Sequence, residues 1–135
     1  MSQLTPGLKG QLGKLVETAD LASAYGNPGV DVLSSMTLMT LLEGSCLRAI
    51  EGGLEPGQMT VGARMEMDHL APTPASFTVT ATAELLEVKG PKLVFAVSAH
   101  DGVEQVARGR HVRFVVEHER FFQGVTQKAA KRSEV

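Results

Sequence analysis

The sequence predicts an α+β domain in which an antiparallel sheet wraps around one long buried helix. Three observations carry the prediction: a helical apolar stretch ending near Ile50, four segments of alternating hydrophobicity after Gln58, and short Gly- or Pro-containing turns between them. The 135 residues, of which 43% are hydrophobic and 21% charged, suit one globular domain.

The first elements are an edge strand and a turn. Residues 7–17 alternate weakly, with Leu8, Leu12 and Val16 between polar and glycine positions, which predicts the edge strand. The run from Tyr25 to Gly29 (Tyr-Gly-Asn-Pro-Gly) then predicts a turn.

The helix follows this turn. Ser34 or Ser35 can serve as its N-cap, and Glu51-Gly52-Gly53 ends it after about Ile50. Its apolar residues occupy most of its circumference, which is typical of a buried helix. They are Met36, Leu38, Met39, Leu41, Leu42, Cys46, Leu47, Ala49 and Ile50.

The remaining strands alternate with a period of two. Lys89-Gly90-Pro91 and Asp101-Gly102 predict tight connections between them. The inward residues expected in the first two strands are Val61, Ala63, Met65 and Met67, then Phe77, Val79, Ala81 and Ala83. A long buried helix followed by such a meander is the hotdog pattern. Because it leaves a sheet edge and a helix flank uncovered, we expect a homodimer or a tetramer.

Composition excludes several other classes of protein. The net charge is −2, and the basic residues Lys128, Lys131 and Arg132 lie in a polar tail, so no nucleic-acid partner is expected. No signal peptide or membrane span is predicted. Cys46 is the single cysteine, so we expect no disulfide, no metal site and a cytoplasmic location. We assign residues 1–125 to the domain and residues 126–135 to the tail.

Two titratable residues stand out. Glu43 lies within the apolar helix, where a carboxylate must be paired, reach solvent or face a cleft. His69 follows Met65 and Met67 in steps of two, which places it on the inward face of its strand. Each alone has a structural explanation, a wet helix side or a hydrogen-bonded core histidine. Together they are suited to acid–base chemistry on a carbonyl.

Three stretches of the chain resemble one branch of the hotdog proteins, the fluoroacetyl-CoA thioesterase-like family. They run from Val32 through Glu43, from Thr60 to Gly62 and from Asp68 to Pro74, and the strand containing Gly109 to Arg113 is also similar. The resemblance implies a catalytic set of a Thr, a Glu and a His, which correspond to Ser35, Glu43 and His69. It also implies that the Gly62 backbone meets the thioester carbonyl.

Two departures from this family qualify the resemblance. Ser35 keeps the hydroxyl but lacks the methyl group, and it serves equally well as an N-cap. The resemblance also implies a lid before the helix, which phenylalanine lines in the family's fluoroacetate-specific member. The corresponding region here contains Tyr25 and no Phe, so selectivity for fluoroacetyl-CoA is not expected. Arg113 lies two residues after His111, so the two side chains should lie on the same face of their strand, and this position of Arg113 has two explanations. The common explanation is a solvated strand face, and the functional one is contact with the CoA phosphates.

The resemblance and the residues lead to one functional hypothesis, the hydrolysis of a small or medium acyl-CoA thioester. Ser35, Glu43 and His69 are the catalytic candidates, and Gly62 and Arg113 are the substrate-binding ones. CoA enters as part of the substrate, and no separate cofactor is expected. The alternative is a non-catalytic hotdog protein that binds acyl-CoA or another small apolar ligand.

Overall fold

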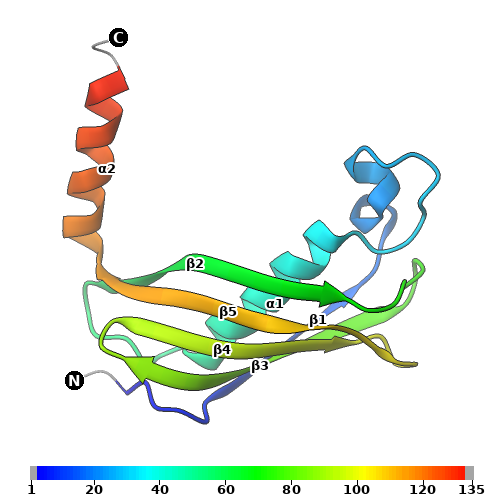
Figure 1. Ribbon diagram of the computed structural model, residues 1–135, viewed down its shortest axis with the longest axis horizontal. Helices are drawn as coiled ribbons and strands as arrows, with labels where there is room; N and C mark the ends of the chain where they lie inside the picture. The colour runs from blue at the N-terminus through cyan, green and yellow to red at the C-terminus, as the bar shows by residue number, and fades with distance from the viewer. Residues whose placement is uncertain (1–2, 133–135) are drawn as a thin grey trace.

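The computed structural model describes residues 3–132, which form a five-stranded antiparallel sheet curled along one long helix (Figure 1). The elements are β1 (Lys9–Leu15), η1 (Thr18–Asp20), η2 (Ala22–Tyr25), α1 (Ser35–Ala49), β2 (Gln58–His69), β3 (Thr78–Lys89), β4 (Lys92–His100), β5 (Gln105–Glu117) and α2 (His118–Arg132). The strand order is β1-β3-β4-β5-β2, so β1 and β2 are the sheet edges. The predicted α+β hotdog fold is confirmed.

Helix α1 begins where the sequence predicts. Ser34 is its N-cap, and the Ser34 hydroxyl accepts a hydrogen bond from the Thr37 N–H at 3.0 Å. The helix packs its apolar residues against the concave face of β1, β3 and β4. Its fully covered side chains include Leu38, Leu42 and Cys46. α1 is therefore the centre of the hydrophobic core, as its sequence indicates.

Strand β1 crosses α1 at very close range. A Cβ atom added at Gly10 would lie 2.3 Å from both the Ala49 nitrogen and the Ser45 carbonyl oxygen. These are backbone atoms of the helix, which cannot move aside independently. Only glycine is accommodated at this crossing, so a side chain at position 10 would push the edge strand away from α1.

A β-bulge changes which residues of β2 face α1. The pairing with β5 shifts between Gly62 and Arg64, so that Gly62 lies opposite Arg113 but Met65 lies opposite His111. Ala63 is the extra residue. The predicted single inward face is therefore wrong for Val61 and Ala63. It is confirmed for the residues after the bulge, Met65, Met67 and His69.

Helix α2 continues directly from β5 and projects away from the body of the molecule (Figure 1). None of its residues is buried, although Phe122 and Val125 are large and apolar. Residues 126–132 of the predicted tail continue this helix as far as Arg132, whereas residues 133–135 lie outside the described residues. The division of the chain at residue 125 stays a prediction. No helix within residues 3–132 is long and apolar enough to cross a membrane.

Candidate active site

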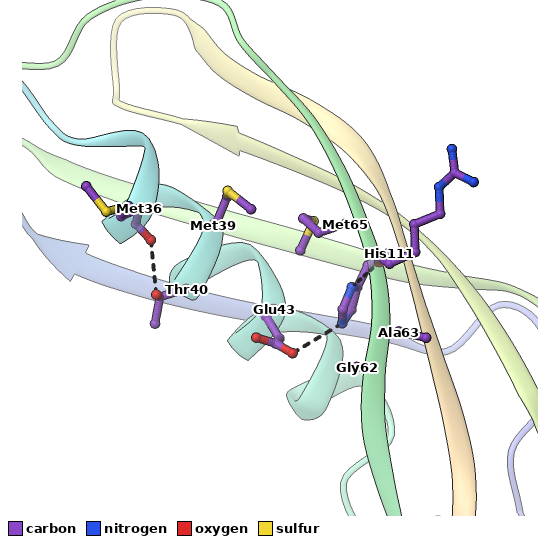
Figure 2. A pocket seen from close by; sticks show the side chains of 9 residues that line it. Met36, Met39, Thr40, Glu43, Gly62, Ala63, Met65 and His111 are labelled. Atoms are coloured by element: carbon purple, nitrogen blue, oxygen red, sulfur yellow. Dashed lines mark hydrogen bonds and ion pairs between the residues drawn. The ribbon is translucent and has the colours of Figure 1, made fainter.

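An open cleft of about 500 Å³ lies between α1 and β2 (Figure 2). Its wall on the helix side carries exposed methionines and a carboxylate, and its wall on the sheet side is formed by the bulged part of β2. The lining residues are Met36, Met39, Thr40, Glu43, Gly62, Ala63, Arg64, Met65 and His111. The predicted catalytic residue Glu43 therefore faces a cavity.

Ser35 and His69 form a pair at the N-terminal end of α1. Because Ser34 provides the N-cap, the Ser35 hydroxyl is free to lie 2.8 Å from Nδ1 of His69. The position of His69 at the end of β2 brings its ring to the first turn of the helix. This geometry separates the two roles considered for the serines, since Ser34 caps and Ser35 contacts the imidazole.

The second nitrogen of His69 has no partner. Nε2 is buried and makes no hydrogen bond within the described residues. Burial lowers the pKa of His69 below its ordinary 6.5, and the backbone of Ala71 acts in the opposite direction. The ring therefore favours its neutral form at neutral pH. A neutral imidazole with one unused nitrogen can still accept or donate a proton.

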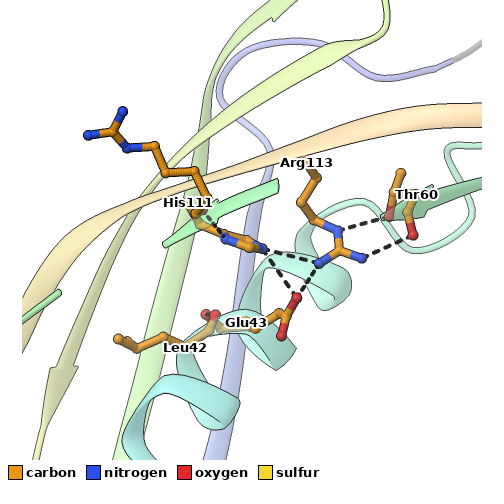
Figure 3. A network of polar contacts seen from close by, with 7 residues as sticks. Leu42, Glu43, Thr60, His111 and Arg113 are labelled. Carbon is orange, nitrogen blue, oxygen red and sulfur yellow. Dashed lines mark hydrogen bonds and ion pairs between the residues drawn. The ribbon is translucent and has the colours of Figure 1, made fainter. Parts of the chain in front are cut away.

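Glu43 lies in a separate polar network (Figure 3). Its Oε2 accepts a hydrogen bond of 2.6 Å from Nη1 of Arg113. The guanidinium also donates from Nε to the Thr60 hydroxyl at 2.9 Å and from Nη2 to the Thr60 carbonyl at 3.0 Å. Arg113 thus connects α1 to β2 and β5 through a fork of fixed geometry.

The absence of a side chain at Gly62 makes room for this network. A Cβ atom at Gly62 would lie 2.7 Å from Oε2 of Glu43 and 3.3 Å from Nη1 of Arg113. The proposed role of the Gly62 N–H toward a thioester stays a prediction. The geometry adds a second function, because glycine allows the carboxylate to approach the strand.

His111 is a member of the network that was not among the residues predicted for the site. Its Nε2 lies 3.1 Å from Nη1 of Arg113, and its Nδ1 lies 2.8 Å from the Arg64 carbonyl oxygen. The sequence offered one indication of this, because His111 lies two residues before Arg113 and therefore on the same face of the strand. The interpretation of that face as solvated is wrong, because His111 and Arg113 are only 2% and 5% exposed.

The predicted site residues therefore occupy two clusters. Ser35 meets His69, and Glu43 meets Arg113 beside Gly62. No hydrogen bond or ion pair joins Glu43 to His69 in the part of the chain that the structure describes. Ser35 and Glu43 are eight residues apart, about 12 Å along a helix axis. The expected contact of Arg113 with CoA phosphates stays a prediction, since its donors are engaged within the protein.

Comparisons with known proteins agree with this fold. A family model described as fluoroacetyl-CoA-specific thioesterase matches residues 16–119. The fluoroacetyl-CoA thioesterase of Streptantibioticus cattleyicolor is 42% identical over 98 residues, which cover 73% of this chain and 70% of that protein.

Solved structures give the same result. A mutant of the fluoroacetyl-CoA thioesterase FlK in complex with acetyl-CoA has a TM-score of 0.85 at 34% identity, covering 93% of this chain and 98% of that chain. A thioesterase superfamily member from Thermus thermophilus has a TM-score of 0.89 at 18% identity, covering 99% and 98%, and shows the fold alone.

Fold, cleft and relatives together define the class of protein, a hotdog-fold acyl-CoA thioesterase. Within that class, the chain belongs to the fluoroacetyl-CoA-specific thioesterase family. The family resemblance predicted from the sequence is confirmed.

Proposed function

We propose that the protein hydrolyses a small or medium acyl-CoA, without a separate cofactor, and that Glu43 is the reacting carboxylate. The observation that carries the proposal is the position of Glu43 at the cleft. Arg113 fixes Oε2, and Oε1 has no hydrogen-bond partner within the described residues. The Glu43 side chain is 44% exposed, which leaves it accessible to substrate or water.

The chemistry follows from this arrangement. Glu43 takes a proton from an attacking water, after which the carbon–sulfur bond breaks to release CoA and the free acid. Alternatively, Glu43 attacks the thioester carbonyl itself, CoA leaves, and water then hydrolyses the acyl–Glu43 anhydride to the free acid and the regenerated carboxylate. Ser35, positioned by His69, orients the carbonyl or the water. The Gly62 N–H offers a hydrogen bond to the developing oxyanion.

A second copy of the chain would bring the two clusters together. β2 is an open sheet edge, and Ser35, Met39 and Glu43 succeed one another at four-residue steps along one flank of α1. If a two-fold axis passes near Met39, an antiparallel partner helix places Glu43 opposite Ser35 and His69 of the partner subunit. We therefore infer a homodimer, or a tetramer built from it, with two composite sites.

Oligomeric state tests this arrangement directly. Light scattering is expected to give a dimer or tetramer, and Met39→Glu is expected to dissociate it and abolish hydrolysis, because the charge would lie at the axis. Leu86→Glu, which changes an exposed leucine on β3, should leave both properties unchanged. An active monomer would contradict the composite site.

The acyl group is proposed to differ from fluoroacetyl. The η1–η2 region contains no phenylalanine, and its Tyr25 hydroxyl accepts a hydrogen bond from the Thr37 side chain at 3.4 Å. The free, buried thiol of Cys46 suits the reducing cytoplasm, where we place the protein.

Thiol release from a panel of acyl-CoAs, with acetyl-CoA and fluoroacetyl-CoA included, tests the activity. Glu43→Ala and His69→Ala are each expected to lose about 10²-fold or more in kcat. Equal activity of the three proteins would contradict the assignment. Tight binding of acyl-CoA by the wild type without turnover would identify a binding protein instead.

A further inference from the structure

His111 is the most deeply buried of the polar side chains around Glu43, and nothing in the proposed chemistry uses it. We propose that His111 is a positioning residue for Glu43 that acts through Arg113. Nδ1 of its ring contacts the Arg64 carbonyl oxygen at the bulge of β2, and Nε2 accepts a hydrogen bond from the Arg113 guanidinium. The inference depends on the catalytic role of Glu43 proposed above.

The partners of His111 determine where its proton lies. The Arg64 carbonyl oxygen can only accept, so Nδ1, at 2.8 Å, must carry the hydrogen. The Arg113 guanidinium can only donate, so Nε2, at 3.1 Å, must present its lone pair. Two independent contacts therefore require the same neutral tautomer.

His111 does not hold Glu43 directly. Its Nε2 lies 3.5 Å from Oε2 of Glu43, and in the required tautomer neither atom carries a hydrogen. Burial is the main cause that lowers the pKa of His111. Arg113 lowers it further, whereas the Arg64 carbonyl and Glu43 raise it. A neutral ring leaves Arg113 as the donor to the carboxylate.

The same contacts fix the rotation of the guanidinium. Nη1 of Arg113 donates to both His111 and Glu43, while Nε and Nη2 are held by Thr60. Without the acceptor at His111, one Nη1 hydrogen loses its partner in a buried site. The guanidinium would then turn toward another acceptor and carry Oε2 with it. The bulge, by presenting the Arg64 carbonyl, thus sets the position of the carboxylate.

Two substitutions at His111 separate positioning from packing. His111→Leu removes both hydrogen bonds and should lower kcat by about 10- to 100-fold, with KM little changed, since a small misplacement of a reacting group has effects of this size. His111→Gln can donate to Arg64 and accept from Arg113, so it should restore most of the activity.

Control variants address stability. Phe95→Leu alters the ring whose centroid is 6.2 Å from that of His111 and should lower Tm while leaving kcat unchanged. Arg110→Leu, on the exposed side of β5, should change neither. Equal loss of kcat in His111→Leu and His111→Gln, in proportion to Tm, would show that the role is only structural.

A double substitution and NMR spectroscopy complete the test. In an Arg113→Lys background, which has no guanidinium for His111 to position, His111→Leu should cause no further loss of kcat, and ¹⁵N spectra of the wild type should show the Nδ1–H tautomer of His111. Additive losses or the Nε2–H tautomer would overturn the proposal. If Glu43→Gln abolishes turnover but His111→Leu does not affect it, only the role of His111 fails. If the wild type is inactive, or remains active as Glu43→Gln, the proposed function fails as well.

Discussion

Ser35 and Glu43 lie on the same flank of α1 about two turns apart, yet they have different kinds of hydrogen-bond partners. The Ser35–His69 pair consists of neutral groups, and Nε2 of its imidazole has no hydrogen-bond partner among residues 3–132. The Glu43 network contains a full charge pair in which the guanidinium makes hydrogen bonds from all three nitrogens. Within the described residues, Nε2 of His69 and Oε1 of Glu43 keep free hydrogen-bonding capacity, which suits groups that exchange protons with a substrate. All three nitrogens of Arg113 are engaged, which suits a group that holds the carboxylate in place.

The largest expected effect concerns the Ser35–His69 pair. Ser35→Ala is expected to lower kcat about 10²-fold, because the hydroxyl orients the reacting groups. Ser34→Ala is the matched control, since it removes the N-cap and should instead cost about 1 kcal/mol of stability. Steady-state thiol release and thermal unfolding of both variants measure the two effects. The division of roles fails if Ser34→Ala loses more activity than Ser35→Ala.

The substitution Arg113→Lys tests whether the hydrogen bonds of the guanidinium hold Glu43 in place. An ammonium keeps the charge but cannot reproduce the fork to Thr60 and Glu43, so kcat should fall about 10- to 100-fold as the carboxylate is misplaced. Arg110→Lys, an exposed exchange on the same strand, should behave as the wild type. Full activity of Arg113→Lys would mean that charge alone is required at this position.

Gly62→Ala is expected to lower kcat less, again by misplacing the Glu43 carboxylate. The added methyl group would lie 2.7 Å from Oε2 of Glu43, and such overpacking typically costs about 1–3 kcal/mol. We expect kcat to fall with little change in KM. Gly13→Ala is the control, because its Cβ would meet atoms no closer than 3.9 Å. Equal kinetics of the two variants would remove Gly62 from the site.

The smallest effect concerns pH. Burial lowers the pKa of both His69 and His111 below 6.5, so the unfolded chain binds more protons than the folded one just below this pH. The free energy of unfolding should therefore fall as the pH decreases below 6.5, as denaturant titrations can measure. The acid limb of kcat/KM should likewise lie below 6.5. A limb above 6.5 that disappears in His69→Asn would contradict the direction given for His69.

The regular elements were predictable because each has a local signal. The apolar circumference of α1, the alternation in β3 and the Asp101-Gly102 connection all appear in the structure as expected. The bulge was not predictable, since Ala63 continues the alternation that it interrupts in space. Helix α2 was missed because its composition is that of a solvated segment.

The site was only partly predictable for a similar reason. Ser35, Glu43 and His69 were chosen from local pattern and family resemblance. Their grouping depends on which residue of β2 lies beside which turn of α1. For Arg113, a solvated strand face was the common explanation and contact with CoA the functional one, because charged residues are seldom buried unless they are paired. The partner of Arg113 is 70 positions away in the sequence.

The bulge at Ala63 also has a consequence for protein engineering. It acts as an insertion of one residue that exchanges the two faces of β2 midway along its length. A regular strand of the same length would keep Gly62 and His69 seven residues apart, an odd number, and would therefore turn one of them toward the opposite face. Transplanting β2 from a hotdog protein with a regular strand would have the same result, even if every side chain of the site were copied. The spacing of this strand is therefore part of the site.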